Sequence, residues 1–592
     1  MDDEKERLFG DKKMSALAIL RHSKPYILAE KWYIILSLFL ILVNVGVSIA
    51  LPWFTSHFVS LFQNEVASDT LNILIWLVIG YAALGIANQA IRYVQAMILQ
   101  KSGQRIVYRL RMEVFEHIES MSQNQFNQMP VGSLVTRVCN YTSAVSDLFT
   151  SVIVQLISNL LTVFGVLGIM MVISIRLSAY LLIFAAAAGV FSFFFWRVVG
   201  KIFRKERGYY SDLNAFLSEN LSGMRITQLF NQEKRKQAEF TVKNENIRRA
   251  NYQVVIAFAI YRPFLNLLYF GSIAVTFWVG LSIALTSAEI VAFYLYLSRF
   301  FNPIQNIADQ LNQIQRATTA AERLFSLLDV PADVVDREDA VDVDHFEGKI
   351  EFRNVWFAYE GENWILKDVS FTVKPGQTMA FVGATGAGKT TILSLIVRNY
   401  EIQKGQILID GMDINHIKIN SLRKGIGQML QDVTLFSGTI RENITLRDDS
   451  FTEEEITEAA DYVNASSFIN NLPAKYEEEV HERGENFSAG QRQLLSFART
   501  ILHRPQILIL DEATANIDTE TELLIQDSLE RIKNIGTMLV VAHRLSTIQH
   551  ADNILVLQNG EVLEQGNHQE LLKKKGHYFK LYQLQYADQE HK

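Results

Sequence analysis

Long apolar stretches dominate the first 325 residues of this 592-residue chain. An uninterrupted apolar run of about 20 residues predicts a membrane-spanning helix, because at about 1.5 Å per residue it crosses a hydrocarbon core about 30 Å thick. The alternative, a set of buried helices in a large soluble protein, is disfavoured because six such runs follow one another. We expect the six spans at about residues 33–56, 71–91, 149–174, 178–198, 260–283 and 288–310.

Positive charge is distributed unevenly between the segments that connect these runs. Residues 1–31, 92–146 and 197–253 carry 7, 6 and 12 Lys and Arg residues, whereas the three loops on the other side carry only Arg176. Cytoplasmic segments of membrane proteins are enriched in Lys and Arg. We therefore expect both termini and the two long loops to be cytoplasmic.

The two long loops have helical character and few helix breakers, so we expect the membrane helices to continue into the cytoplasm as stalks. Each loop has one polar turn zone, near residues 121–132 and near residues 220–226, where a stalk would touch something below the membrane. Residues 14–31 mix apolar and basic positions, which is typical of an amphipathic helix lying in the membrane interface. A solvated N-terminal tail is the alternative for that segment.

The second part of the chain has a different composition. Residues 326–349 form an acidic linker, and residues 350–592 alternate short β-branched runs with helical stretches, which is typical of a soluble α/β domain. The formal charge is +9 for residues 1–325 and −16 for the remainder, and the total of −7 argues against a nucleic-acid partner. The single cysteine, Cys139, excludes a disulfide scaffold and a zinc site built from several thiols.

The α/β part contains a phosphate-binding pattern. The run 379–382 predicts a strand, and it is followed by Gly383-x4-Gly388-Lys389-Thr390 and a helix, which is the P-loop pattern in its required context. Backbone N–H groups of such a loop surround phosphate oxygens, and the helix N-terminus adds a favourable dipole. Lys389 would reach the β- and γ-phosphates of ATP, and the Thr390 hydroxyl would bind Mg²⁺. The residues of this loop expected to contact nucleotide are Gly383, Thr385, Gly386, Ala387, Gly388, Lys389, Thr390 and Thr391.

Two further apolar strands end in side chains that suit the same chemistry. The run 506–510 is followed by Asp511 and Glu512, and ligands of α/β sheets bind at the carboxyl ends of parallel strands. Asp511 suits a Mg²⁺ ligand, and Glu512 suits a general base for the attacking water. A third strand, at 537–542, ends in His543. A lone histidine is more often structural, but this position also suits a contact with the γ-phosphate.

The order of these motifs resembles that of an ABC exporter half-transporter, and the resemblance covers essentially the whole chain. Such a protein has an α-helical polytopic membrane domain fused to an α/β P-loop ABC ATPase domain. Phe487-Ser-Ala-Gly-Gln491 is similar to the family's signature motif and stands about 20 residues before Asp511. Shorter motifs of the family are matched by Gln431 (the Q-loop glutamine that contacts Mg²⁺), Asp518 (the D-loop aspartate), Tyr359 (the A-loop aromatic that stacks on adenine) and residues 482–485 (a segment that touches the coupling turns).

The resemblance implies a dimer that works by alternating access. Two ATPase domains would close head to tail on two ATP molecules, each held between the P-loop of one chain and the signature of the other. Ser488, Gly490 and Gln491 would therefore bind the partner's ATP. Closure would switch the membrane helices from inward-facing to outward-facing, and hydrolysis would reset them. The residues implied to take part in hydrolysis are Glu512, His543 and Gln431.

The signature departs from the family's usual Leu-Ser-Gly-Gly-Gln at two positions. Phe487 keeps an apolar side chain, whereas Ala489 adds a Cβ where the backbone approaches phosphate and restricts φ. With Glu512 intact, the chain resembles the subunit of heterodimeric bacterial multidrug exporters that keeps the glutamate but has a drifted signature. We therefore favour a heterodimer over a homodimer.

The polar residues inside the expected spans include Asn44, Arg262 and Arg299. A charged residue at bilayer depth costs at least ~2.5–3.5 kcal/mol, so it usually faces a cavity or a partner. These residues are candidates for the substrate path. A structural hydrogen bond, or snorkelling of the charge to the interface, is the alternative for each.

The sequence therefore predicts ATP-driven export of hydrophobic or amphipathic compounds, of the multidrug type, by a multi-pass protein of a bacterial plasma membrane. We expect a transmembrane domain at 1–325, a linker at 326–349 and a nucleotide-binding domain at 350–592. The implied cofactors are ATP and Mg²⁺, and the implied partners are a second half-transporter subunit, the lipid bilayer and small amphipathic substrates. Two alternatives stay open: a homodimeric flippase for lipids or lipid-linked substrates, and an ATPase that regulates its membrane domain without transport.

Overall fold

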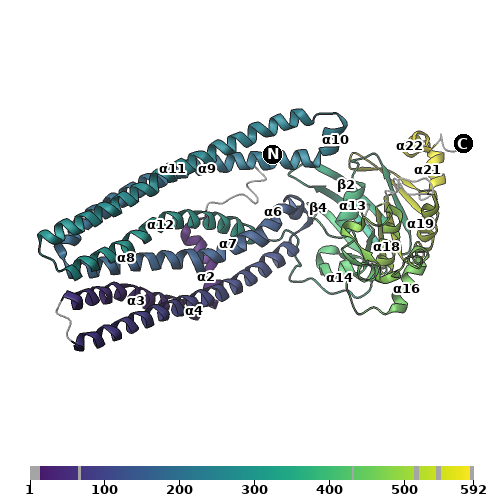
Figure 1. Ribbon diagram of the computed structural model, residues 1–592. Helices are drawn as coiled ribbons and strands as arrows, with labels where there is room; N and C mark the ends of the chain where they lie inside the picture. Colours follow the sequence, from purple (N-terminus) through teal and green to yellow (C-terminus); the bar gives the residue numbers. More distant parts are fainter. Residues whose placement is uncertain (1–13, 64–67, 430–432, 512–518, 542–547, 587–592) are drawn as a thin grey trace. The chain divides into compact units, whose positions relative to one another are not determined.

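The chain folds into two compact units, a helical unit and an α/β unit (Figure 1). The computed structural model describes residues 14–63, 68–429, 433–511, 519–541 and 548–586. The helical unit comprises residues 1–119 and 130–330, and the α/β unit comprises residues 120–129 and 331–592. The short segment 120–129 therefore packs with the α/β unit, although its neighbours on both sides belong to the helical unit.

Several helices of the helical unit are far longer than a bilayer is thick. The longest, α4, has 53 residues, which at a rise of about 1.5 Å per residue gives a helix of about 80 Å. The helices are α2 (Ala16–Ala29), α3 (Lys31–Gln63), α4 (Ser68–Ser120), α6 (Val131–Thr136), α7 (Thr142–Asp147), α8 (Ile153–Ile173), α9 (Ile175–Ser222), α10 (Met224–Leu229), α11 (Glu233–Ser282) and α12 (Ser287–Leu328).

Five helical stretches in the described part of the chain are long and apolar enough to cross a membrane. Only 11% to 33% of each apolar window is buried inside the protein, so most of its apolar surface faces outward. Buried helices of a soluble protein would show the opposite, so that alternative is wrong. The sixth expected span, 288–310, lies within the 42-residue helix α12. The five stretches are Lys31–Leu61, Asn72–Ser120, Val131–Ile173, Ile175–Ser222 and Glu233–Ser282.

The third of these stretches is one helical rod with two changes of hydrogen-bond pattern, which the sequence did not predict. Five-residue π-helical segments, Arg137–Tyr141 and Leu148–Val152, separate α6 from α7 and α7 from α8. Each π segment widens the helix locally and turns the following residues relative to the preceding ones. Thr142, the residue that follows the first π segment, donates from its hydroxyl to the carbonyl oxygen of Val138 inside that segment at 2.6 Å.

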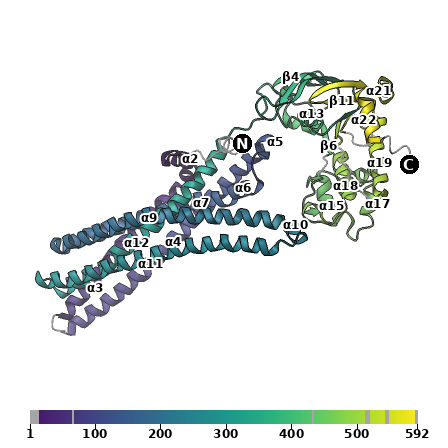
Figure 2. The same cartoon turned by 90° about the horizontal axis from the view of Figure 1, so that it is seen from above.

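The core of the helical unit lies where α8, α9, α11 and α12 meet. Helices α9 and α11 run side by side and are joined by the short α10 in both views (Figure 2). Tyr261 of α11 stacks on Phe195 of α9 with ring centroids 3.9 Å apart, and its hydroxyl lies 3.0 Å from that of Ser192. Phe293 and Tyr296 of α12 are fully buried in the same cluster. Packing therefore accounts for these aromatic residues.

The short helix α2 is fastened at both ends to longer helices. Its Tyr26 hydroxyl donates to the carboxylate of Glu113 on α4 at 2.5 Å, and burial, followed by that carboxylate, raises the pKa of Tyr26. The imidazole of His22 lies 3.1 Å from the carboxylate of Asp329, just after α12. The buried carboxylate of Glu30, at the C-cap of α2, lies 3.6 Å from a guanidinium of α4, that of Arg105. Helix α2 therefore contacts both the second half of α4 and the residue that follows α12.

The α/β unit is built on a six-stranded sheet in the order β12-β11-β3-β10-β9-β6. Its five strands from β11 to β6 are parallel, and β12 is antiparallel at one edge. Strand β3 lies between β11 and β10, so the loop that follows it stands near the middle of the sheet's carboxyl edge. The strands are β3 (Thr378–Gly383), β6 (Ile426–Met429), β9 (Ile507–Asp511), β10 (Thr537–Val541), β11 (Asn553–Gln558) and β12 (Glu561–Gly566).

A second, antiparallel sheet has the order β2-β1-β4-β5, and a two-stranded ribbon pairs β7 with β8. The apolar side chains of β1 and β2 alternate with polar ones, which places one face of this sheet against the six-stranded sheet. The strands are β1 (Ile350–Ala358), β2 (Trp364–Val373), β4 (Lys404–Ile409), β5 (Met412–Asp413), β7 (Gly438–Thr439) and β8 (Glu479–Val480).

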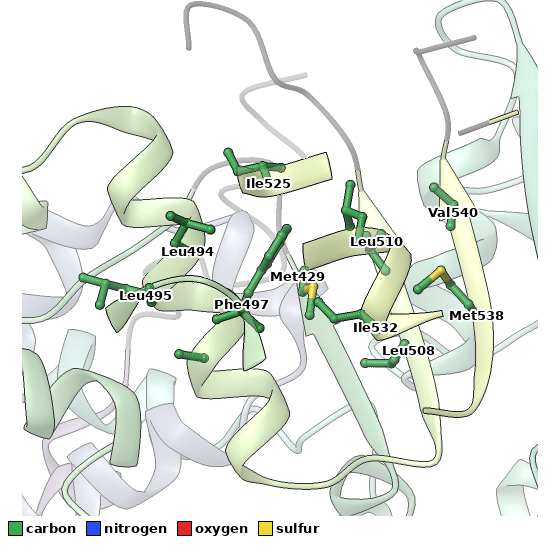
Figure 3. Packing of buried hydrophobic residues seen from close by; sticks show 14 of the residues in the cluster. Met429, Leu494, Leu495, Phe497, Leu508, Leu510, Ile525, Ile532, Met538 and Val540 are labelled. Atoms are coloured by element: carbon green, nitrogen blue, oxygen red, sulfur yellow. The ribbon is translucent and has the colours of Figure 1, made fainter. Parts of the chain in front are cut away.

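Helices cover the other side of the six-stranded sheet. Leu494 and Phe497 of α18 belong to the same buried cluster as Leu508 and Leu510 of β9, and Figure 3 shows Phe497 directed toward Met429, between the helix and the strands. Five consecutive residues of β10 are buried, as expected for a strand covered on both faces. The helices of the unit are α5 (Gln123–Asn127), α13 (Lys389–Ile396), α14 (Ile419–Lys424), α15 (Ile440–Thr445), α16 (Glu453–Tyr462), α17 (Ser466–Ile469), α18 (Ala489–Leu502), α19 (Thr519–Ile532), α21 (His568–Lys574) and α22 (His577–Tyr586).

Candidate functional site

The loop between β3 and α13 has the backbone geometry of a phosphate cradle. Gly386 and Gly388 have φ values of +82° and +100°, which L residues with a Cβ rarely adopt. A Cβ on Gly383 would lie 2.3 Å from the carbonyl oxygen of Leu557, and one on Gly388 would lie 2.6 Å from a methyl of Leu366. The loop can therefore close tightly only with glycine at these positions, and α13 then begins at Lys389.

Lys389 is folded into this loop. Its ammonium donates hydrogen bonds of 2.8 Å and 3.1 Å to the carbonyl oxygens of Gly383 and Ala384. Burial lowers the pKa of this side chain, and the carboxylate of Asp511 opposes that effect. The ammonium is therefore close to both the P-loop and the end of β9, where it can exchange carbonyl oxygens for phosphate oxygens.

An aromatic cluster stands beside α13. The hydroxyl of Tyr359 lies 3.0 Å from that of Thr391, and the ring of Tyr359 meets those of Phe357 and Tyr400 edge to face at 4.9 Å and 5.1 Å. Burial, followed by the neighbouring Tyr359, raises the pKa of Tyr400, and a hydrogen bond from Asn127 opposes this. The ring of Tyr359 is 40% exposed, so it leaves one face open on which a flat base can stack.

The residues expected to hold Mg²⁺ are described only in part. Thr390 is exposed at the first turn of α13, and Asp511 ends β9, one strand away from β10 and two from β3. A hydroxyl and a carboxylate at the carboxyl ends of parallel strands are hard oxygen ligands of the kind that Mg²⁺ prefers, so the two fit the ion. The other expected residues of this centre, Gln431, Glu512, Asp518 and His543, lie outside the described residues.

The signature residues cap their own helix. Ser488 is the N-cap of α18, and its hydroxyl accepts from the backbone N–H of Gln491 at 3.2 Å. The Gln491 side chain accepts in return from the backbone N–H of Ser488 at 2.9 Å. Gly490 is buried, and Ala489 is half-buried at the first position of the helix. A helix N-terminus presents free N–H groups and a positive dipole end, so this motif can receive an anion once a phosphate approaches it.

Phe487, the first departure from the family's usual signature, is part of the hydrophobic core. Its side chain is buried and packs edge to face on Phe468, with ring centroids 6.3 Å apart. The carbonyl oxygen of Phe487 accepts a 2.7 Å hydrogen bond from the guanidinium of Arg492 on α18. A larger apolar residue at this position therefore fixes the loop in front of α18 and does not face the nucleotide side.

Segment 120–129 is joined to the linker by a buried glutamine that the sequence reading did not single out. The Gln125 carboxamide donates to the carbonyl oxygen of Pro331 at 2.7 Å and accepts from the backbone N–H of Asp333 at 3.3 Å. The hydroxyl of Ser122 donates to the carboxylate of Asp333 at 3.4 Å. Since Gln125 also completes a capping box with Ser122, the turn and its attachment to the linker form one network.

The linker continues from this point as a strap across the α/β unit. The buried guanidinium of Arg398, just after α13, donates to the carbonyl oxygen of Val335 at 2.9 Å. The carboxylate of Asp336 accepts from the backbone N–H of Ile419 at 2.8 Å, and Lys418 pairs with Asp342 at 2.5 Å. The acidic residues of the linker are therefore explained by the basic segment that they contact.

In the helical unit, the structure separates two of the expected substrate-path residues from the third. The guanidinium of Arg299 donates to the hydroxyl of Ser48, four residues after Asn44 on α3, at 2.6 Å. The guanidinium of Arg262 instead lies over the ring of Phe258 on its own helix, 5.9 Å from the centroid. Asn44 and Arg299 therefore approach the same part of the fold, whereas the described contact of Arg262 is local to α11.

A glycine-rich loop at the centre of a parallel sheet, with a buried lysine and a carboxylate-ended neighbouring strand, defines a P-loop ATPase, here in one chain with membrane-spanning helices. The chain belongs to the ABC transporter family. The family model described as the ABC transporter transmembrane region matches residues 34–304, and the one described as ABC transporter matches residues 366–515.

Curated relatives extend this match along most of the chain. It is 38% identical to the "Probable multidrug resistance ABC transporter ATP-binding/permease protein YheH" of Bacillus subtilis, over 88% of this chain and 78% of that one. It is 34% identical to the "ATP-dependent lipid A-core flippase" of Syntrophus aciditrophicus, over 87% of this chain and 86% of that one.

A solved structure confirms the fold. A bacterial Atm1-family ABC exporter with ATP bound matches with a TM-score of 0.80 at 26% identity, over 94% of this chain and 98% of that one. The expected fold class, the resemblance to ABC exporter half-transporters and the coupling of ATP hydrolysis to transport are thereby confirmed. The chain is a multi-pass membrane protein that binds ATP.

Proposed function

We propose that this chain is one half of a dimeric exporter that moves hydrophobic or amphipathic compounds out across the cytoplasmic membrane by alternating access. The observation that carries this proposal is the place of segment 120–129, which lies inside the matched transmembrane region but packs within the ATPase unit. A conformational change in the ATPase unit would therefore move the end of α4 and the start of α6, which flank this segment. The names of the multidrug and flippase relatives support a cargo with an apolar part.

In this proposal the P-loop and its neighbours bind ATP. Tyr359 stacks on adenine, and the N–H groups of residues 383–391 surround the phosphates. Lys389 gives up its bonds to Gly383 and Ala384 and pairs with the β- and γ-phosphates. Thr390, Asp511 and Gln431 would hold Mg²⁺, which supplies positive charge against the phosphate oxygens.

In this proposal, the residues that follow β9 and β10 carry out ATP hydrolysis. Glu512 accepts a proton from the attacking water, and His543 contacts the γ-phosphate and so distinguishes ATP from ADP. Asp518 stands at the boundary with the second ATPase domain. These roles are inferred from the sequence position of each residue after β9 or β10; β10 pairs with the P-loop strand β3, and β9 pairs with β10.

Ser488, Gly490 and Gln491 act on the ATP of the partner subunit. We favour a heterodimer, since Ala489 places a Cβ at the start of α18, where the partner's phosphate would approach, while Glu512 is retained. The site that contains Glu512 would then be the fast one, and the site covered by Phe487–Gln491 the slow one. A homodimeric flippase for lipids is the second candidate, and the name of the lipid A-core relative favours it.

The experiment that tests this proposal measures ATP turnover and vesicle transport by the purified chain, alone and co-expressed with half-transporters encoded beside it. The heterodimer predicts activity only with a partner, and loss of that activity in Glu512→Gln. Full activity of the chain alone would refute the heterodimer and support the homodimer. Turnover that persists in Glu512→Gln would refute its role as the base, and turnover without flux of any amphiphile would refute export.

A further inference from the structure

Arg299 is a charged residue with most of its hydrogen-bonding capacity unused. It stands twelve residues after the start of α12, or about 18 Å along the helix, and in the middle of the span expected at 288–310. A guanidinium carries five N–H donors, and the described structure gives it one hydrogen bond, to the Ser48 hydroxyl. Its charge also interacts with the Tyr81 hydroxyl and with the guanidinium of Arg92, both on α4.

Carboxylates are scarce at this depth. The six expected spans contain acidic residues only near the ends of the last one, Glu289 and Asp309. Glu289 is engaged in the N-terminal cap of α12, and Asp309 stands ten residues beyond Arg299, about 15 Å along the helix. Among the described residues, neither Arg299 nor Arg92 forms an ion pair, whereas Arg105 and Arg109 further along α4 face the carboxylate of Glu30.

Two polar stripes meet at Arg299. On α3, Ser37, Asn44, Ser48 and Thr55 follow one another at intervals of seven, four and seven residues, which places them on one helix face. On α4, Tyr81, Asn88 and Arg92 are spaced in the same way. The Asn44 side-chain nitrogen, a donor, is buried without a partner among the described residues, and so is the side-chain oxygen of Asn88. Unpaired polar atoms inside an apolar helix bundle are costly, so such a group implies an occupant.

An apolar cavity adjoins the two stripes. It has a volume of about 310 Å³, within the range of ligand sites, and lies between α3 and α4. Thr55 of the α3 stripe and Tyr81 of the α4 stripe both line this cavity, so the cavity is continuous with the polar stripes. The remaining lining residues are Phe54, Phe58, Leu77 and Val78.

We propose that this place binds an anionic amphiphile, with its phosphate or carboxylate on Arg299 and its hydrocarbon chain in the cavity of Phe54, Phe58, Leu77 and Val78. The proposal rests on the proposed export function and names the class of cargo. The planar guanidinium matches both anions in a bidentate way, and Arg92 and the free Asn44 amide add a second charge and a donor. A cationic compound would meet two guanidinium groups and no described carboxylate.

The test uses the assembled transporter in nanodiscs of zwitterionic lipid. Three probes share a dodecyl chain: dodecyl phosphate, dodecanoate and dodecyltrimethylammonium. We expect at least one anionic probe to bind ten times more tightly than the cationic one. Arg299→Gln should remove this preference without weakening the cationic probe, and Arg299→Lys should keep most of it. Arg197→Gln is the matched control, because that guanidinium lies over the ring of Phe193 on its own helix, α9, and is expected to leave all three affinities unchanged.

A second variant tests the cavity without touching a charge. Val78→Trp fills the space between α3 and α4, and should weaken dodecyl phosphate but not butyl phosphate. Preference for phosphate would indicate a phospholipid-type headgroup, and preference for carboxylate a fatty-acid-type one. An unchanged preference in Arg299→Gln, or an equal loss in Arg197→Gln, would overturn the site.

A vesicle transport assay distinguishes failure of the proposed anion site from failure of the proposed export function. Transport of the cationic probe with no binding of the anionic ones would refute the anion site and leave export standing. Binding of an anionic probe that depends on Arg299, with no ATP-dependent movement of any probe, would support the site and refute export.

Discussion

The carboxamide of Gln125 donates a 2.7 Å hydrogen bond to the carbonyl oxygen of Pro331. Gln125 belongs to the turn that follows α4, and Pro331 begins the linker that follows α12. Two distant exits from the helical region are therefore fastened to each other within the ATPase unit. The linker residue Val335 also accepts a hydrogen bond from Arg398, just after the C-terminal end of α13, the helix whose N-terminus begins at the P-loop.

Replacing Gln125 by Ala should uncouple ATP turnover from transport. The variant removes the hydrogen bonds to the Pro331 carbonyl and from the Asp333 N–H, which are partly buried, at a cost of about 0.5–1.5 kcal/mol each. We expect ATPase activity within about threefold of the parent and at least fivefold less substrate moved per ATP. Gln123→Ala is the matched control, because that side chain is exposed and bonds only to Asn127. Equal coupling in both variants would contradict the role of the strap.

Tyr359 should contribute to ATP affinity through its ring more than through its hydroxyl. Stacking of a base on an aromatic side chain is worth about 1–3 kcal/mol. We expect Tyr359→Leu to weaken ATP binding about tenfold or more, measured by equilibrium binding of a fluorescent ATP analogue. Tyr359→Phe loses only the contact with Thr391 and should change the affinity less than threefold. Equal losses in the two variants would show that the hydroxyl contact matters instead.

The drifted first residue of the signature should act on stability rather than on catalysis. Truncating a buried Phe to Ala costs about 3–5 kcal/mol, so Phe487→Ala should lower the temperature at which the transporter loses ATPase activity by several degrees. Phe487→Leu, which restores the family's usual residue, should cost less than about 1.5 kcal/mol. Phe436→Ala, at an exposed phenylalanine of the same unit, should have little effect. A large change in turnover with no change in thermal midpoint would argue for a catalytic role.

The single cysteine offers a direct measurement of orientation. Cys139 is exposed, and it follows the turn that we expect in the cytoplasm. A membrane-impermeant maleimide should therefore leave it unlabelled in intact cells and modify it in inside-out vesicles. Cys139→Ser provides the background control. Labelling from outside intact cells would reverse the proposed topology.

Much of the fold could be predicted because its signals are local. Apolar runs specify long helices, and Gly383, Gly388 and Lys389 specify a P-loop by spacing alone. The cap formed by Ser488 and Gln491 is also a short-range pattern, with the serine three residues before the glutamine. In each of these cases the residues that determine the structure lie within one or two turns of the chain.

The parts that the sequence did not reveal depend on long-range contacts. Gln125 is one of several glutamines in a polar turn, and only the fold shows that it meets a linker more than 200 residues away. The same holds for Arg299, whose neighbours Ser48 and Tyr81 come from other helices, and for the π-helical segments at 137–141 and 148–152. The residue types along a single sequence do not specify which helices pack against each other.

The reciprocal cap at the start of α18 has a consequence for assembly. Since the side chains of Ser488 and Gln491 bond to each other's backbone within one chain, the signature segment is already folded in a single subunit. In the proposed dimer, the partner's ATP would therefore meet a preformed helix N-terminus, and binding would exchange these capping hydrogen bonds for contacts with phosphate oxygens without a folding step.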